Sequence, residues 1–225
     1  MKTNQSLHFR LMVLSIFVCI NSFAQTDTSL HITQLPINYS KERIDLSIEY
    51  LKTRHGISQL TPTITPKIIV LHFTGFGNIK SIYEYFNAPT IEESRQINRK
   101  VSALNVGSHY LINRDGTIYQ LISDTLFARH VIALNYCAIG VENIGSEKEP
   151  LTEAQVISNA KLVRLLCERY KIQYLIGHDE YINFRGTPVW KETDPKYITY
   201  KSDPGKKFME DVRALTKDLG LRSAP

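Results

Sequence analysis

The sequence has few cysteines. Only three of its 225 residues are cysteine, and they form neither a CxxC pair nor a regularly spaced framework. Cys137 and Cys167 are the two that lie beyond the N-terminal region. A disulfide between them could form in an oxidising compartment. We expect two unpaired core thiols instead, because free cysteine commonly packs as a small hydrophobe.

The sequence also lacks an apolar run long enough to cross a membrane. The longest stretch, Leu11 to Ile20, is shorter than the ~20 residues that a spanning helix needs. It follows Lys2 and Arg10 and precedes small residues that end at Ala24. This pattern predicts a signal peptide over residues 1–24 that is cleaved after Ala24. We therefore expect an exported protein, periplasmic or secreted, without stable membrane insertion.

No excess of one charge dominates the chain. The sequence has 27 Lys and Arg against 22 Asp and Glu, a formal net charge of +5. Cleavage would remove Lys2 and Arg10 and leave +3. No block of Lys and Arg resembles a nucleic-acid-binding stripe, so we expect no nucleic-acid partner. A mildly basic surface suits an anionic polymer such as cell wall, but an ordinary solvated surface explains it equally well.

The mature length of about 200 residues is enough for one well-buried domain. We predict an N-terminal extension over residues 25–60 with one helix, which Ser40 caps and Gly56 ends. A single domain over residues 61–220 and a short tail over 221–225 follow.

Strand and helix patterns alternate along the predicted domain. Apolar runs predict strands that end near His72 and His178, a hairpin around residues 114–116 and a strand over 138–142. Helices are predicted after Asn78, after the capping box of Thr152 and Gln155, and near Pro204. Interleaved strands and helices with one hairpin indicate an α/β fold, a single domain with a central mixed β-sheet covered by helices.

Three ligand-type residues stand at the edges of these segments. His72 and His178 each close an apolar run, and Asp203 precedes the last helical pattern. Two imidazoles and a carboxylate suit a divalent metal such as zinc with room left for water, which indicates metal-assisted hydrolysis. Taken singly, each histidine is more often a structural group, and Asp203 before Pro204 also fits a helix N-cap with proline at N1.

Two further residues suit the same chemistry. Lys201 should face the same side as Asp203, two residues on, and could stabilise an oxyanion, although a solvated lysine is commoner. Glu142 alternates away from Ile139 and Val141, and the neighbouring Gly140 would leave space for a substrate. Glu142 could carry the transferred proton if its pKa lies near neutrality.

Together these segments resemble the zinc-dependent type 2 N-acetylmuramoyl-L-alanine amidases, a family that includes peptidoglycan recognition proteins and phage lysozyme-type amidases. The resemblance runs from about Lys67 to Phe208. The matching segments are Ile-Val-Leu-His72-Phe-Thr74, Ser108-His109-Tyr110-Leu-Ile with Arg-Asp115-Gly116, Ile139-Gly-Val-Glu142, Gly177-His178-Asp179 and Lys201-Ser-Asp203-Pro-Gly205.

The resemblance implies roles for these residues. His72, His178 and Asp203 would bind Zn²⁺, Glu142 would be the catalytic acid and base, and Lys201 would stabilise the transition state. The reaction implied is hydrolysis of the amide between N-acetylmuramic acid and L-alanine in peptidoglycan or muropeptides.

The chain departs from the family pattern at some positions. Ser108 stands where some members have a catalytic tyrosine, which shifts the weight onto Glu142. Where the family often has Ala-Trp-His-Ala-Gly, residues 128–132 of this chain are Ala-Arg-His-Val-Ile. His130 is therefore a candidate for the wall of the substrate site, but the residues beside it differ from those of the family. Asn135 keeps an asparagine that would lie near substrate, although a turn residue is equally consistent.

Several imitations and alternatives remain. The segment from Lys191 to Asp194-Pro195 partly imitates the one around Asp203, but its spacing differs, and we prefer Asp203 as the ligand. His109 reads better as a core histidine than as a ligand. Three aromatic residues of the later segments could line a sugar groove or simply pack: Tyr181, Phe184 and Trp190.

Two other function classes compete with the amidase. A non-catalytic muropeptide-binding module on the same fold would typically have lost a metal ligand, and none is missing here. A cysteine hydrolase that uses Cys137 with His130 or His178 would need no metal, but no helix N-terminus is evident that would lower the pKa of the thiol. The sequence does not determine the oligomeric state.

Overall fold

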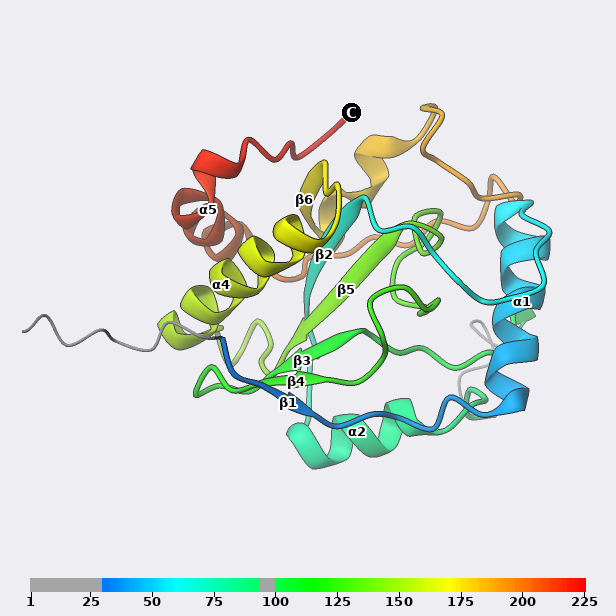
Figure 1. The fold of residues 1–225 in the computed structure, drawn as a ribbon, viewed down its shortest axis with the longest axis horizontal. Coiled ribbons are helices and arrows are strands. Elements are labelled where there is room, and N and C mark those ends of the chain that lie inside the picture. The colour runs from blue at the N-terminus through cyan, green and yellow to red at the C-terminus, as the bar shows by residue number, and fades with distance from the viewer. Residues whose placement is uncertain (1–29, 94–99) are drawn as a thin grey trace, which may run out of the picture.

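The computed structural model describes residues 30–93 and 100–225. The predicted signal peptide over residues 1–24 lies outside the described residues. A six-stranded sheet runs through the molecule in the order β1-β4-β3-β5-β2-β6 (Figure 1). The strands are β1 (Ile32–Gln34), β2 (Ile68–Phe73), β3 (Tyr110–Ile112), β4 (Ile118–Gln120), β5 (Ala138–Asn143) and β6 (Tyr174–Gly177).

The sheet is mixed, as the sequence predicts. The hairpin strands β3 and β4 pair antiparallel, and all the other neighbours pair parallel. The expected hairpin is confirmed, but its two strands are shorter than the apolar segments that predicted them. β1 pairs with β4, so part of the predicted N-terminal extension joins the edge of the sheet.

The helices lie on both sides of this sheet. They are α1 (Lys41–His55), α2 (Ile79–Asn87), α4 (Glu153–Arg169) and α5 (Lys206–Leu215), with 3₁₀ turns η1 (His178–Phe184) and η2 (Lys217–Leu219). α4 and α5 lie side by side on one face, whereas α2 and α1 lie away from them (Figure 1). The α/β fold with a central mixed sheet is therefore confirmed.

The predicted helix starts are confirmed by their caps. The Ser40 side chain accepts from Arg43 N at α1, and Gly56 ends that helix in the left-handed conformation at φ 65°. Asn78 caps α2, and Thr152 with Gln155 forms the expected capping box of α4. These local bonds satisfy backbone N–H groups that a helix start leaves without partners.

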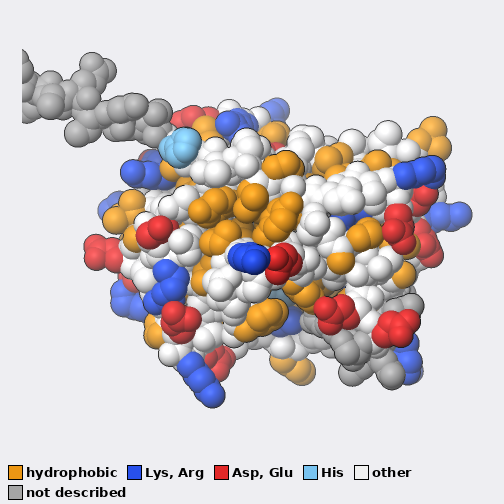
Figure 2. All heavy atoms as spheres, turned by 90° about the horizontal axis from the view of Figure 1, so that it is seen from below, with side chains coloured by type: hydrophobic (Ala, Val, Ile, Leu, Met, Phe, Trp, Pro, Cys, Tyr) orange, Lys and Arg blue, Asp and Glu red, His pale blue; other side chains and the backbone are white. Residues whose placement is uncertain are grey.

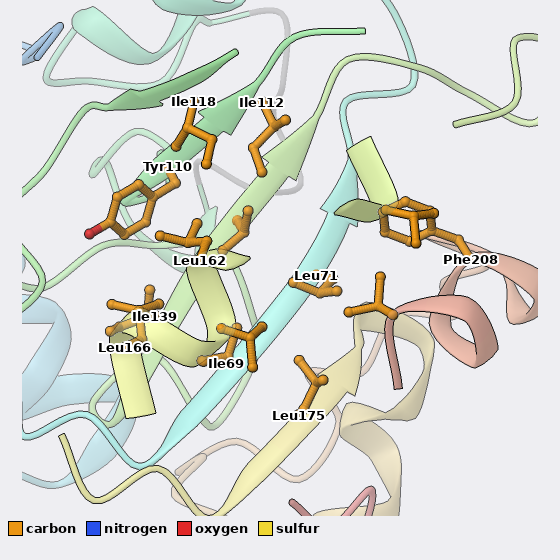
Figure 3. Close-up of a cluster of buried hydrophobic side chains, with 14 of the residues drawn as sticks. Ile69, Leu71, Tyr110, Ile112, Ile118, Ile139, Leu162, Leu166, Leu175 and Phe208 are labelled. Carbon is orange, nitrogen blue, oxygen red and sulfur yellow. The ribbon is translucent and has the colours of Figure 1, made fainter. Parts of the chain in front are cut away.

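Strand alternation divides the core into two layers. Ile69 and Leu71 of β2 and Ile139 of β5 face α4 and α5, where they pack with Leu166 and Phe208 (Figure 3). The residues between them, among which are Ile68, Val70 and Ala138, face the opposite layer. His72 continues the Ile68 and Val70 series, so it points away from α4 and α5.

The surface seen from the side of α2 mixes both charges with apolar side chains and shows no block of one sign (Figure 2). Among the described residues, no helix has the length and apolar character needed to span a bilayer.

Candidate metal centre and active site

Two histidines and one aspartate converge at the carboxyl ends of the neighbouring strands β2 and β6. One ligand atom from each of His72, His178 and Asp203 lies within 4.8 Å of the other two. Asp203 Oδ2 is 3.2 Å from His72 Nδ1 and 3.0 Å from His178 Nδ1. All three side chains are buried. Two nitrogens and a carboxylate oxygen that meet in this way are a donor set suited to a divalent metal.

The parallel strands explain why residues more than 100 positions apart meet. His72 ends the buried part of β2, and β6, the next strand in the sheet, leads directly into His178. Asp203 is held beside them because its carbonyl oxygen accepts from Asp179 N at 3.1 Å. Gly177 permits this approach, since a Cβ there would lie only 3.0 Å from Pro204 Cδ. Ligand sites commonly form at this edge of parallel sheets.

Asp203 does not cap the last helix. The N-cap of α5 is Gly205, which makes no side-chain cap, and the Asp203 carboxylate turns to the histidines instead. Burial opposes ionisation of this carboxyl. Its hydrogen bonds with His178 and His72 outweigh burial and hold the pKa of Asp203 well below its usual value. The carboxylate is therefore ionised, as a metal ligand must be.

Glu142 stands beside His72 on the neighbouring strand, in direct register with it. Its Oε2 atom is buried and has no hydrogen-bond partner among the described residues. Burial, with a smaller contribution from the charge of Asp203, raises the pKa of Glu142, and the charges of His72 and Lys201 oppose the rise, so that the pKa lies at about 7. A carboxyl with a pKa near neutrality can both accept and donate a proton at physiological pH.

A pocket of about 290 Å³ joins these groups. Glu142, Lys201 and Asp203 all line it, so the prediction that Lys201 and Asp203 face one site is confirmed. Lys201 is exposed, whereas Glu142 is partly buried. The remaining lining residues come mainly from the 73–76 loop, α2 and the 106–107 segment: Phe73, Thr74, Gly75, Phe76, Ile82, Tyr85, Phe86, Val106, Gly107, Arg129, His130 and His178.

Of the two candidate substrate residues, His130 lines this pocket and Asn135 binds the backbone of His130. Asn135 is buried, and its Oδ1 accepts from the backbone N–H of His130 at 2.9 Å and of Val131 at 2.8 Å. Asn135 Nδ2 has no partner among the described residues, and the residue borders a second pocket of about 100 Å³ with His178 and Lys201. Asn135 thus stabilises the turn through its side-chain oxygen, while its side-chain nitrogen has no partner among the described residues.

The structure corrects the reading of Gly140. The sequence indicated space for a substrate beside this glycine, but the His130 ring fills that space. A Cβ on Gly140 would lie 2.6 Å from His130 Cγ. His109, read as a core histidine, is fully buried; it accepts from Gly140 N and lies 2.9 Å from Leu126 O.

The segment that imitates the Asp203 motif is tied to α1 instead. The side chain of Glu192 is buried and pairs with Arg54 at 2.7 Å, while that of Asp194 is half exposed. Thr193 N donates to Arg54 O, and His55 Nδ1 lies 2.5 Å from Lys191 O. Neither acidic residue of the imitation reaches the histidine pair, and Asp203 is the aspartate that does.

The alternative that uses a cysteine nucleophile is not supported. Cys137 is buried, and burial raises the pKa of its thiol to about 12. A thiol in such surroundings is protonated and unreactive at neutral pH. Cys137 and Cys167 are both free, as expected.

The three aromatic residues of the later segments pack rather than line a groove. Tyr181 and Phe184 are buried in the layer below β2, where Phe184 contacts the Tyr174 ring. Trp190 stacks on Tyr181 with an interplanar angle of 18°. The sequence alone is consistent with either arrangement.

A family comparison accounts for this arrangement. Residues 62–206 match the family described as N-acetylmuramoyl-L-alanine amidase. The chain belongs to this family. No curated protein matches the sequence. The match begins after α1, so β1 and α1 lie outside it although both pack on the matched part.

Solved structures show the same fold. The N-acetylmuramoyl-L-alanine amidase LysC from Clostridium intestinale URNW is 21% identical, with a TM-score of 0.51 over 86% of this chain and 100% of its own. A selenomethionine derivative of AmpD is 23% identical, with a TM-score of 0.52 over 82% and 93%. Bumblebee PGRP-SA is 12% identical, with a TM-score of 0.53 over 88% and 100%. The fold is thus shared by amidases and recognition proteins.

Proposed function

We propose that this family member is a zinc-dependent N-acetylmuramoyl-L-alanine amidase that hydrolyses the amide between N-acetylmuramic acid and L-alanine in peptidoglycan or muropeptides. The observation that carries the proposal is the convergence of His72, His178 and Asp203 next to a carboxyl whose pKa is about 7. A binding module needs to retain neither a complete ligand set nor a titratable group beside it.

His72 and His178 would hold zinc through Nδ1, and Asp203 through its carboxylate, in a buried donor set of the kind that zinc enzymes use. When bound, zinc supplies a Lewis acid that polarises the scissile carbonyl and lowers the pKa of water at the site.

Glu142 is the proposed proton carrier. Its carboxylate takes a proton from the water that attacks the carbonyl carbon. The resulting carboxyl then donates that proton to the amide nitrogen as the carbon–nitrogen bond breaks. A pKa of about 7 supports both steps, because neither protonation state is strongly favoured over the other. Its Oε2 atom has no hydrogen-bond partner among the described residues, so this oxygen is available for the exchange.

Lys201 is proposed to stabilise the negative charge that develops on the carbonyl oxygen. It lines the same pocket as Glu142 and Asp203, and its positive charge acts on Glu142. Ammonium groups beside a developing oxyanion lower the barrier because the charge they neutralise is larger in the transition state than in the substrate. Asn135 Nδ2, buried without a partner, is proposed to donate to a substrate oxygen.

The wider setting of the reaction follows from the sequence. A signal peptide over residues 1–24 would export the protein to the periplasm or the medium, where peptidoglycan is accessible. The second candidate is a non-catalytic binding module, since the fold is also that of bumblebee PGRP-SA. The complete ligand set favours the enzyme.

The decisive experiment is mass spectrometry of the products after the mature chain, residues 25–225, has been incubated with peptidoglycan. We expect free stem peptides that begin with L-alanine, lost with a chelator and restored by added zinc. Unchanged peptidoglycan despite bound zinc and measurable affinity would support the binding module. Products that persist with chelator but disappear in Cys137→Ser would support a cysteine hydrolase.

A further inference from the structure

His130 lies against the outer side of His72, away from Asp203. His130 Nδ1 is 3.1 Å from His72 Nε2, and the two rings meet edge to face at an interplanar angle of 89°. His72 has its other nitrogen, Nδ1, on the side of Asp203 and His178. His130 is not one of the three residues whose ligand atoms converge, so it is not a fourth ligand in this arrangement.

The protein fixes which nitrogen of His130 carries the proton. His130 Nε2 lies 3.2 Å from the carbonyl oxygen of Ala138, which can only accept. Neutral His130 therefore carries its proton on Nε2, and its Nδ1 can only accept. The proton in the contact between the two imidazoles must then come from His72 Nε2. A histidine with its proton on Nε2 has the Nδ1 lone pair available for a metal.

The His130 ring is held in place from three sides. The Asn135 amide oxygen binds the backbone N–H of His130 and of the next residue. The Ala138 carbonyl binds the far nitrogen of the ring. Gly140 leaves the space into which the ring fits, since a Cβ would come within 2.6 to 2.8 Å of three ring atoms. A ring that only filled space would not need a hydrogen-bond partner at each of its two nitrogens.

We propose that His130 is a positioning residue that holds His72 in the Nε2–H tautomer and in the orientation that presents Nδ1 to the metal. The inference rests on the proposed zinc site and adds to it a residue that acts through a ligand without touching the metal. Outer hydrogen-bond partners of this kind orient metal-binding histidines and increase their basicity. Both hydrogen-bonding nitrogens of His130 are thereby used within the protein.

Zinc affinity tests this directly, by competition with a chromophoric chelator on folded protein. His130→Leu removes the acceptor, and Gly140→Ala displaces the ring without changing a polar side chain. We expect each to weaken zinc binding roughly 10- to 100-fold. His130→Asn, which keeps an acceptor close to the position of Nδ1, should recover most of the affinity. His31→Leu, which alters an exposed histidine outside the site, should leave it unchanged.

A second readout is the tautomer itself. Nitrogen NMR of the zinc-loaded protein should show the proton of His130 on Nε2, and the cobalt-substituted protein should change its visible spectrum in His130→Leu but not in His31→Leu. These signals would not move if His130 only stabilised the fold, and Gly140→Ala gives a second route if His130→Leu does not fold.

The outcomes separate this inference from the proposed function. Tight zinc binding by wild type with unchanged affinity in both His130→Leu and Gly140→Ala would overturn the role of His130 alone. A proton on His130 Nδ1 would do the same. A wild-type chain that binds no zinc would overturn the zinc site and this inference together.

Discussion

Two segments of the chain share a lysine followed by an aspartate and a proline, yet their surroundings differ. In the 191–195 segment, Asp194 is half exposed and the buried Glu192 pairs with Arg54 of α1. In the 201–205 segment, Asp203 is buried against His72 and His178. The first segment therefore anchors a loop to a helix, and the second assembles a site. The residues that a carboxylate contacts in the folded chain, and not its neighbours in the sequence, therefore determine its function.

The two segments are also connected. The chain from Lys191 to Thr199, fixed to α1 at Arg54 and His55, leads directly into Lys201 and Asp203. Tyr181 OH donates to Thr199 O at 2.7 Å and holds the end of that loop. The first segment thus supports the second, although α1 lies outside the residues that match the family.

The largest expected effect separates the two aspartates. Asp203→Ala should abolish zinc binding and activity, because it removes one of three ligand groups and leaves two. The loss of zinc affinity should exceed the roughly 10- to 100-fold that the loss of an outer hydrogen-bond partner costs. Asp194→Asn is the matched control and should keep both properties. Chelator competition and product analysis measure them; equal zinc affinity in both variants would contradict the assignment of Asp203.

Glu142 and Glu192 should differ in their effect on catalysis. Glu142→Gln should lower kcat by about 10²- to 10⁴-fold while zinc stays bound, because the proton carrier is lost. Glu192→Gln should leave kcat nearly unchanged in the folded protein. Stopped assays with a muropeptide, read by mass spectrometry, give kcat and KM. If Glu142→Gln retained the wild-type rate, another group would have to carry the proton.

The two lysines provide a smaller contrast. Lys201→Met should lower kcat by on the order of 10²- to 10³-fold through the loss of oxyanion stabilisation. Lys191→Met should have little effect, because the Lys191 ammonium lies over the Tyr136 ring and not in the pocket. A loss confined to KM in Lys201→Met would instead indicate a role in substrate binding.

The anchor of the first segment should matter for stability. Glu192→Gln leaves the guanidinium of Arg54, whose side chain is 13% exposed, without its charged partner. We expect a loss of about 3 kcal/mol in the free energy of unfolding. Urea unfolding followed by circular dichroism measures this. Asp194→Asn, at 4.0 Å from Arg54 and half exposed, should cost far less.

The same anchor should also make the stability of the protein depend on pH. Burial lowers the pKa of His55 to about 4, although its bond to Lys191 O acts the other way. The folded protein thus binds the proton less readily than the unfolded chain, whose histidine has a pKa near 6.5. The stability that neutral His55 contributes is complete above about 6.5 and declines as pH falls toward 4, by about 1.4 kcal/mol per pH unit.

His55→Phe tests this at the anchor. The difference in unfolding free energy between wild type and His55→Phe, measured by urea unfolding at several pH values, should change across this window and be constant above it. A pH-independent difference would show that His55 titrates normally in the folded chain.

Much of the fold could be predicted from local patterns. Ser40, Asn78 and Thr152 each cap a helix as expected, because a cap depends on a side chain and a backbone N–H only two or three residues apart. β1 was missed as a strand because it is three residues long and has no alternation strong enough to indicate pairing. Its partner β4 lies more than 80 residues away.

The site could be predicted only in part. His72, His178 and Asp203 stood at segment ends, where parallel strands bring side chains together, and the structure does bring them together. The contact of His130 with His72 could not be read from the sequence, since the two residues are 58 positions apart and belong to different segments. For the same reason Gly140 was read as leaving space for a substrate.

The sequence by itself determined the strand and helix pattern, the caps and the residues capable of metal chemistry, because these depend on neighbours along the chain. Only the tertiary structure decided that Asp203 and not Asp194 meets the histidines, that Glu192 pairs with Arg54 while Glu142 lines the pocket, and where the His130 ring lies. Those outcomes depend on burial and on contacts between distant segments, and they arise only when the strands have taken their places in the sheet.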